Sequence, residues 1–278
     1  MTEGGESERF DISMTTPAGP VTVAVDVPAY FVPIASIVPS MRRMGEAAQA
    51  LEERRVVAQG SAVSCKKGCA ACCRMLIPVS APEAFALADT INTWPADRRE
   101  ATLARMADAR ARLEQAGVLS HLREVAASER QLGDDAFEPI NRAYYALRLP
   151  CPFLVEESCS IYDDRPAACR ELLVTSPAEL CQDLERNPVS PLPVPLRIGT
   201  VLALLWSDLG GGPARFIPLP LALEWAERHA QEGARPWKGR ELLERALDKV
   251  WWYLSREITA RQPAAHGSSI PGQGIPQP

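Results

Sequence analysis

Four of the chain's eight cysteines lie within the nine residues Cys65-Lys66-Lys67-Gly68-Cys69-Ala70-Ala71-Cys72-Cys73. Thiolates are soft ligands that suit zinc, copper(I) or iron–sulfur clusters, and thiols spaced two or three residues apart can converge on one centre. In a helix these four cysteines would share one face. Gly68 disfavours that helix by about 1 kcal/mol relative to alanine, so a turn between Cys65 and Cys69 that opens into a helix is the alternative. Either geometry keeps the thiols together.

The other four cysteines follow at Cys151, Cys159, Cys169 and Cys181. Prolines 150 and 152 predict an extended backbone around Cys151, because a proline pushes its neighbour out of the α region. The run Asp163-Asp164-Arg165-Pro166 predicts the start of a helix with the proline in its first turn. Cys169 would then lie near the helix N-terminus, where the helix dipole lowers a thiol pKa.

Length and composition indicate an ordinary folded protein. The chain has 278 residues, of which 46% are hydrophobic and 23% charged, enough to bury a core without help from a metal. A net charge of −5 argues against a nucleic-acid or anionic-membrane surface. Residues 1–10 lack the features of a secretory signal, and the most apolar stretch, 198–206, is too short to cross a bilayer. We therefore expect a soluble cytoplasmic protein whose clustered cysteines bind metal rather than form disulfides.

Hydrophobic periodicity predicts a mainly α fold, an irregular helical metal-binding domain with a small N-terminal β-hairpin. The hairpin comprises residues 10–16 and 21–27 around the turn Pro17-Ala18-Gly19-Pro20, and is expected to be a small appendage. Ser80 and Glu83 form a capping-box pattern at a helix start. Helical patterns cover residues 39–57, 80–93, 96–115, 121–130, 137–147, 220–231 and 238–257, with Leu103, Met106, Arg110 and Leu113 along one stripe of the third.

These elements suggest four parts. Residues 1–60 would form the hairpin and a lead-in helix, and residues 61–186 a cysteine-cluster domain whose helical insert, 80–147, covers the site. Residues 187–260 would hold the C-terminal helices after a proline-rich linker at 187–195. Residues 261–278 are rich in proline, glycine and serine and are expected to form a disordered tail.

The order and surroundings of the cysteines resemble the YkgJ-type cysteine-cluster family. The resemblance rests on Cys65-x3-Cys69-x2-Cys72-Cys73, Cys151-Pro152-Phe153-Leu154, the run from Cys159 through Tyr162 and Arg165-Pro166 to Cys169-Arg170, and Cys181. It spans about residues 64–181, and it implies chelation of zinc or iron by all eight cysteines. A related cluster occurs in flagellin lysine methylases, where it implies an iron–sulfur centre and a methyl donor; here only the cysteines carry over.

Cys65-x3-Cys69-x2-Cys72 also has the spacing of the radical S-adenosylmethionine signature. Two features argue against that enzyme class. The residue before the third cysteine is usually aromatic in that family and is Ala71 here. Downstream, the sequence does not alternate strands and helices as a barrel requires.

The predicted ligands are therefore Cys65, Cys69, Cys72, Cys73, Cys151, Cys159, Cys169 and Cys181. Adjacent cysteines leave a helix about a hundred degrees apart, so Cys72 and Cys73 are expected to serve two centres or to bridge two metals. Arg165, Arg170 and Tyr162 are expected to support the site from outside the ligand set. The resemblance implies iron first, as an iron–sulfur cluster or alone, with zinc a close second, because the spacing of the cysteines does not separate these metals. Soft thiolate ligands also tolerate copper(I), which is a distant third.

Three functions fit this pattern. The first is an iron–sulfur protein that moves electrons or serves a modification reaction on a protein or peptide, as the methylase resemblance implies. The second is a zinc-stabilised structural or interaction module. The third is a protein that binds metal reversibly. The sequence offers no nucleophile, paired carboxylates or phosphate loop above background, so an enzymatic role is left open.

Overall fold

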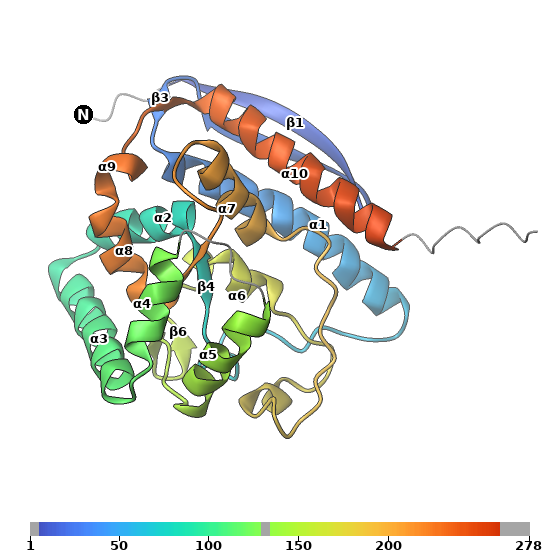
Figure 1. Ribbon diagram of the computed structural model, residues 1–278. Coiled ribbons are helices and arrows are strands. Elements are labelled where there is room, and N and C mark those ends of the chain that lie inside the picture. The colour runs from blue at the N-terminus through green and yellow to red at the C-terminus, as the bar shows by residue number, and fades with distance from the viewer. Residues whose placement is uncertain (1–5, 129–133, 262–278) are drawn as a thin grey trace, which may run out of the picture.

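The structure is mainly α-helical with an N-terminal β-hairpin, as the periodicity predicts (Figure 1). The structure is a computed structural model, and it describes residues 6–128 and 134–261. The strands are β1 (Ser7–Thr16), β2 (Gly19–Pro28), β3 (Phe31–Val32), β4 (Pro78–Ser80), β5 (Leu154–Val155), β6 (Ser158–Cys159), β7 (Phe216–Pro218) and β8 (Trp237–Lys238). The helices are α1 (Val38–Ala58), α2 (Ala81–Asn92), α3 (Ala96–Gln115), α4 (Leu119–Ala127), α5 (Asp134–Ala146), α6 (Ala167–Glu171), α7 (Ile198–Asp208), α8 (Ala222–Arg228), α9 (Ala230–Gly233) and α10 (Gly239–Arg261).

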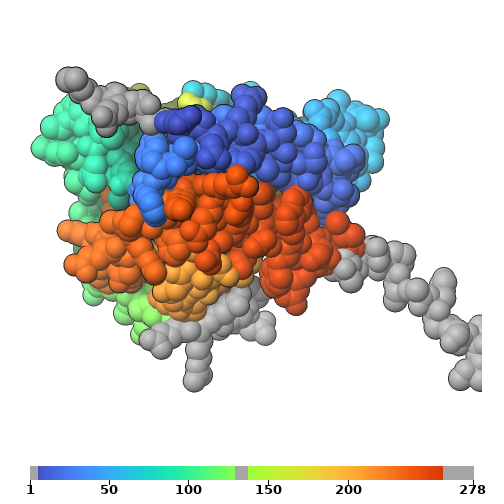
Figure 2. Space-filling view, turned by 90° about the horizontal axis from the view of Figure 1, so that it is seen from above, coloured from blue at the N-terminus to red at the C-terminus, as the bar shows by residue number. Residues whose placement is uncertain are grey.

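The hairpin is part of the core, so the expectation of a small appendage was wrong. β1 and β2 pair antiparallel from Ser7 opposite Pro28 to Thr16 opposite Gly19. Alternate residues of β2 face inward, and Val25 and Val27 are 0% and 2% exposed. Strand alternation explains this, because every second side chain points to the same face. Figure 2 shows the hairpin lying along α10, so the two ends of the described chain form one face of the molecule.

Helices α1, α2, α7, α8 and α10 enclose the centre of the core. The apolar stretch noted in the sequence forms α7, where Val201, Leu202 and Leu205 are fully buried. Rings of Phe85, Trp206 and Trp225 pack beside it with centroids 5.5–5.8 Å apart. Among the described helices, none has the length and apolarity needed to span a bilayer.

Local signals predicted most helix boundaries. α3 begins and ends where the sequence indicates, and the capping box of α2 is confirmed. Within α3 the predicted stripe was partly wrong: Leu103 is 44% exposed, because Thr102 and Ala109 fill the buried face together with Met106 and Leu113.

Two other expectations met a different outcome, and a third falls largely outside the described residues. Residues 220–231 form two helices rather than one, because the backbone breaks at His229, whose ring stacks on Trp225 at 4.0 Å. The proline-rich 187–195 stretch is hydrogen-bonded to residues 173–175. The Leu192 amide donates to the Leu173 carbonyl at 2.7 Å, and the Thr175 amide donates to the Ser190 carbonyl at 2.9 Å. Of the expected tail, Arg261 ends α10 and residues 262–278 lie outside the described residues.

A glycine fixes the junction between the hairpin and α10. A Cβ added to Gly239 would lie 2.0 Å from the Pro28 carbonyl oxygen, a backbone atom that cannot rotate away. We expect Gly239→Ala to lower the free energy of unfolding by about 1–3 kcal/mol, the usual effect of overpacking. Urea denaturation measures this. Gly199→Ala in α7 is the matched control, because its nearest contact would be an ordinary 3.4 Å; equal losses in the two variants would contradict the steric explanation.

Candidate metal centre

The first four cysteines lie in a non-helical segment with turns at residues 67–68 and 71–74, so the helical alternative for residues 65–73 was wrong and the turn alternative holds for its first part. The Cys69 amide donates to the Lys66 carbonyl at 3.0 Å, and Cys73 donates to Ala70 at 3.0 Å. Gly68 has φ +90°, in the left-handed region that favours glycine. The expected helix after the turn does not form; the chain instead passes through further turns into β4.

Backbone hydrogen bonds bring the second set of cysteines against the first. The Cys151 amide donates to the Cys73 carbonyl at 2.7 Å, and the Ser64 amide donates to Val174 at 2.9 Å. These contacts join residues about 80 to 110 positions apart in the sequence, so both cysteine segments belong to one region. β4 pairs with β7 and anchors this region to the core.

The remaining three cysteines come from short elements. Cys159 lies in β6, opposite Leu154. Cys169 lies in α6, a helix of five residues. Pro166 is the N-cap of this helix and not, as predicted, a residue of its first turn. Cys181 lies in a 3-10 helix, Ala178–Gln182, and is buried. All eight cysteines are free thiols.

The cysteines fall into two groups that meet at Cys72. Cys181 interacts electrostatically with Cys65, Cys72 and Cys69. Cys169 interacts with Cys151, Cys72 and Cys159. We call Cys65, Cys69 and Cys181 the first group, and Cys151, Cys159 and Cys169 the second group. Cys72 is close to both, and its side chain is hydrogen-bonded to that of Cys73.

Burial and crowding raise the pKa of several thiols. Burial raises the pKa of Cys151 to about 12 and that of Cys181 to about 11, and neighbouring cysteines add to both shifts. The hydrogen bond to Cys73, followed by burial, raises the pKa of Cys72. Burial also raises the pKa of Cys169 well above its usual range. The expected lowering by the helix dipole is therefore outweighed, since α6 is short and the thiol is enclosed.

The donor set fits a soft metal ion or cluster. Eight thiols gathered in one region provide sulfur ligands in the number that two four-cysteine sites require. A metal cation would reverse the pKa shifts above, because a coordinating thiol is deprotonated. Across residues 6–128 and 134–261, no three histidine, cysteine, aspartate or glutamate side chains already stand close enough to hold an ion.

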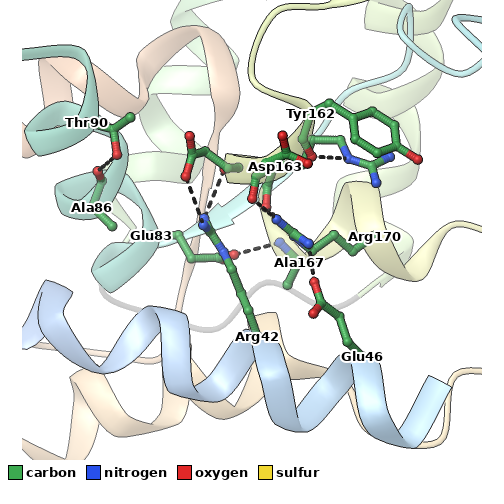
Figure 3. Close-up of polar contacts among 11 residues, drawn as sticks. Arg42, Glu46, Glu83, Ala86, Thr90, Tyr162, Asp163, Ala167 and Arg170 are labelled. Carbon is green, nitrogen blue, oxygen red and sulfur yellow. Dashed lines mark hydrogen bonds and ion pairs between the residues drawn. The ribbon is translucent and has the colours of Figure 1, made fainter. Parts of the chain in front are cut away.

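The three residues expected outside the ligand set occupy different positions. Arg165 lies over the Tyr162 ring at 3.7 Å and donates through Nε to the Tyr162 carbonyl at 2.9 Å. Its charge opposes the rise in the pKa of Cys169 that burial causes. Arg170 instead contacts Glu46 of α1 and the Asp163 carbonyl (Figure 3). The charge of Arg165 thus acts on the thiols and Tyr162 stacks against Arg165, while Arg170 links α6 to α1.

Glu83 was missed as a residue that positions the site. It is 1% exposed, and its Oε2 accepts from the Ser80 hydroxyl at 2.7 Å and the Ser80 amide at 3.1 Å. Its Oε1 accepts from the Ala167 amide at 2.6 Å (Figure 3). The capping box of α2 therefore also fixes the first residue of α6, which carries Cys169. The capping-box pattern signalled the first role, but no local pattern signals the second.

A cavity of about 690 Å³ opens onto the first group at Cys69. Charged side chains of both signs line it, among them Lys66, Arg148 and Glu179. Arg74, at its wall, pairs with Glu157 at 2.7 Å. The cysteine region is therefore accessible from solvent on this side.

Comparison with known proteins supports the resemblance. Residues 64–187 match a family model, CxxCxxCC, described as "Putative zinc- or iron-chelating domain". No curated protein and no solved structure matches the chain. The matched range contains all eight cysteines and the elements that bring them together. Over residues 64–187, slightly less than half of its length, the chain is thus similar to the CxxCxxCC family, whose model is described as a zinc- or iron-chelating domain.

Proposed function

We propose that the eight cysteines hold iron, in the first instance as an iron–sulfur centre, and that the centre serves electron transfer or a modification reaction on a protein or peptide. The observation that carries the proposal is that Cys72 interacts electrostatically with a cysteine of each group of thiols. Sulfur ligands in such numbers match what iron–sulfur clusters take. A bound cluster would supply one-electron chemistry.

The surroundings of the cysteines support a role that needs access. Cavities reach Cys69 on one side and Cys65 on another, so the first group is not sealed by protein. A cluster that exchanges electrons or meets a substrate needs such an approach. Free thiols also suit a reducing compartment, and we therefore place the protein in the cytoplasm.

A zinc-stabilised module is the second candidate, and one observation favours it. The segments that carry the cysteines, 61–77 and 150–197, contain mostly turns and short elements. Structural zinc sites typically fix segments of this kind, because metal binding provides free energy that a small core does not. In this case the cysteines would hold a surface in place rather than perform chemistry.

Elemental analysis and an absorption spectrum of protein purified without oxygen test the proposal. Iron with acid-labile sulfide, and a broad visible band that weakens on reduction, are expected for the first candidate. A colourless protein with about two zinc ions per chain, which melts at a lower temperature after chelation, would favour the second. A chain that binds neither metal would contradict both.

A further inference from the structure

β1 forms one edge of the two-stranded sheet of the hairpin. Over residues 6–128 and 134–261, β2 is its one pairing partner, and no backbone hydrogen bond joins residues 7–16 to an element outside the hairpin. Figure 2 shows the hairpin at the surface of the molecule. The edge of β1 that faces away from β2 therefore presents a row of open N–H and C=O groups, which can pair with a further strand.

This edge lacks the features that usually prevent the addition of a strand. Proteins protect their sheet edges with short strands, bulges, prolines or lysines. β1 is ten residues long and contains neither proline nor lysine. It pairs with β2 without a bulge, from Ser7 opposite Pro28 to Thr16 opposite Gly19. The edge is therefore available for pairing with another chain.

Charges on the solvent-facing side of the sheet identify that chain. Arg9 and Asp11 are exposed and lie two residues apart, so their side chains are on the same face of β1. Arg9 stands opposite Asp26 of β2, and Asp26 is paired with Arg43 of α1 at 3.5 Å. The signs thus alternate across the sheet and end with Arg9 at the free edge. The next strand should place a carboxylate beside Arg9 and a cation beside Asp11.

We propose that β1 pairs antiparallel with β1 of a second copy of the chain, about a two-fold axis that places Phe10 opposite Phe10 of the other copy. In this register Arg9 of each copy faces Asp11 of the other, so two pairs of opposite charges form. An axis at Arg9 or at Asp11 would place like charges opposite each other, and an axis at Ile12 would form neither pair. An axis between two residues would turn core-facing side chains toward solvent.

The core-facing side of β1 favours the same arrangement. Phe10 and Ile12 are only half-buried, whereas Val23 and Val25 of the neighbouring β2 are 9% and 0% exposed. A second copy of β1 would cover the open side of Phe10, whose ring already lies 5.8 Å from the guanidinium carbon of Arg240 in α10. Burial of the remaining apolar area adds to the free energy of pairing.

Analytical ultracentrifugation of the full chain in reducing buffer tests the proposal. A strand edge of this length buries less area than a permanent dimer interface, so we expect a dissociation constant of about 10–100 μM. The average mass should then rise from 30.3 kDa toward twice that value as the protein concentration rises from about 1 μM to about 1 mM. A mass that stays at 30.3 kDa over this range would overturn the proposal.

Two charge reversals test the register. Asp11→Arg places a cation opposite Arg9 of the second copy, and Arg9→Asp places a carboxylate opposite Asp11. Each variant alone should therefore self-associate at least about tenfold more weakly than the native protein. When the two variants are mixed in equal amounts, both pairs join opposite charges, and a heterodimer of about native affinity should form. Self-association of Asp11→Arg at native strength would rule the register out.

Glu100→Arg in α3 is the matched control for Asp11→Arg, because it changes the net charge equally at an exposed position outside the hairpin. It should associate as the native protein does. Asp11 stands opposite Ala24 in its own hairpin, so Asp11→Arg creates no like-charge pair there, and circular dichroism checks that each variant is folded. Absence of a heterodimer from two folded variants would contradict the proposal. The hairpin does not line the cavities at Cys69 and Cys65, so metal content, measured on the same samples, reports separately on the proposed function.

Discussion

Replacing Glu83 with alanine is expected to lower the free energy of unfolding by about 3–5 kcal/mol. The change leaves three buried donor groups without an acceptor: the amide and hydroxyl of Ser80 and the amide of Ala167. It also removes the negative charge of Glu83, which raises the pKa of Arg42 and so opposes the lowering of that pKa by burial. Unsatisfied buried donors and a less compensated buried cation both destabilise the folded state. Urea denaturation followed by circular dichroism measures the loss.

The same substitution should reduce the metal content, because Ala167 begins the helix that carries Cys169. Glu83→Gln is expected to fall between native protein and Glu83→Ala, since the amide retains an acceptor oxygen but loses the charge. The exposed Glu100→Ala in α3 is the matched control and should change stability by less than about 0.5 kcal/mol. If Glu83→Ala is as stable as Glu100→Ala, the contacts of Glu83 do not hold α6 in place.

Local patterns in the sequence were enough to predict most regular elements. α2 and α3 begin and end close to the predicted residues, because caps and apolar spacing act within a few positions of each other. The pairing of the hairpin was also local, since its strands are joined by a short turn. Its burial was not, because β2 packs against α10, more than two hundred residues away, as well as against α1.

The cysteine pattern identified the candidate site but not its local structure. Both a helix over residues 65–73 and a series of turns would keep the four thiols close together, so the spacing of the cysteines could not separate the two conformations. The left-handed backbone at Gly68 decides for turns. Glu83 was missed because its contact with Ala167 depends on how distant segments pack.

Cys72→Ser is expected to remove more metal than any substitution confined to one group of cysteines. Cys72 interacts with Cys181 of the first group and Cys169 of the second, so a ligand lost here affects both. A serine hydroxyl keeps the size of the side chain but is a poor ligand for a soft metal. Eight thiolates suffice for two four-cysteine sites, so Cys181→Ser should retain about half of the metal and Cys72→Ser little of it.

Metal content per chain and acid-labile sulfide, determined on anaerobically purified variants, measure the difference. Ala71→Ser is the matched control, because it places a hydroxyl one residue away and leaves all eight thiols intact; it should keep the native metal content. If Cys72→Ser and Cys181→Ser retain equal amounts of metal, Cys72 serves a single group and the two groups are independent. Loss of all metal in both variants would instead indicate one shared centre, because a single cluster that loses a ligand is lost as a whole.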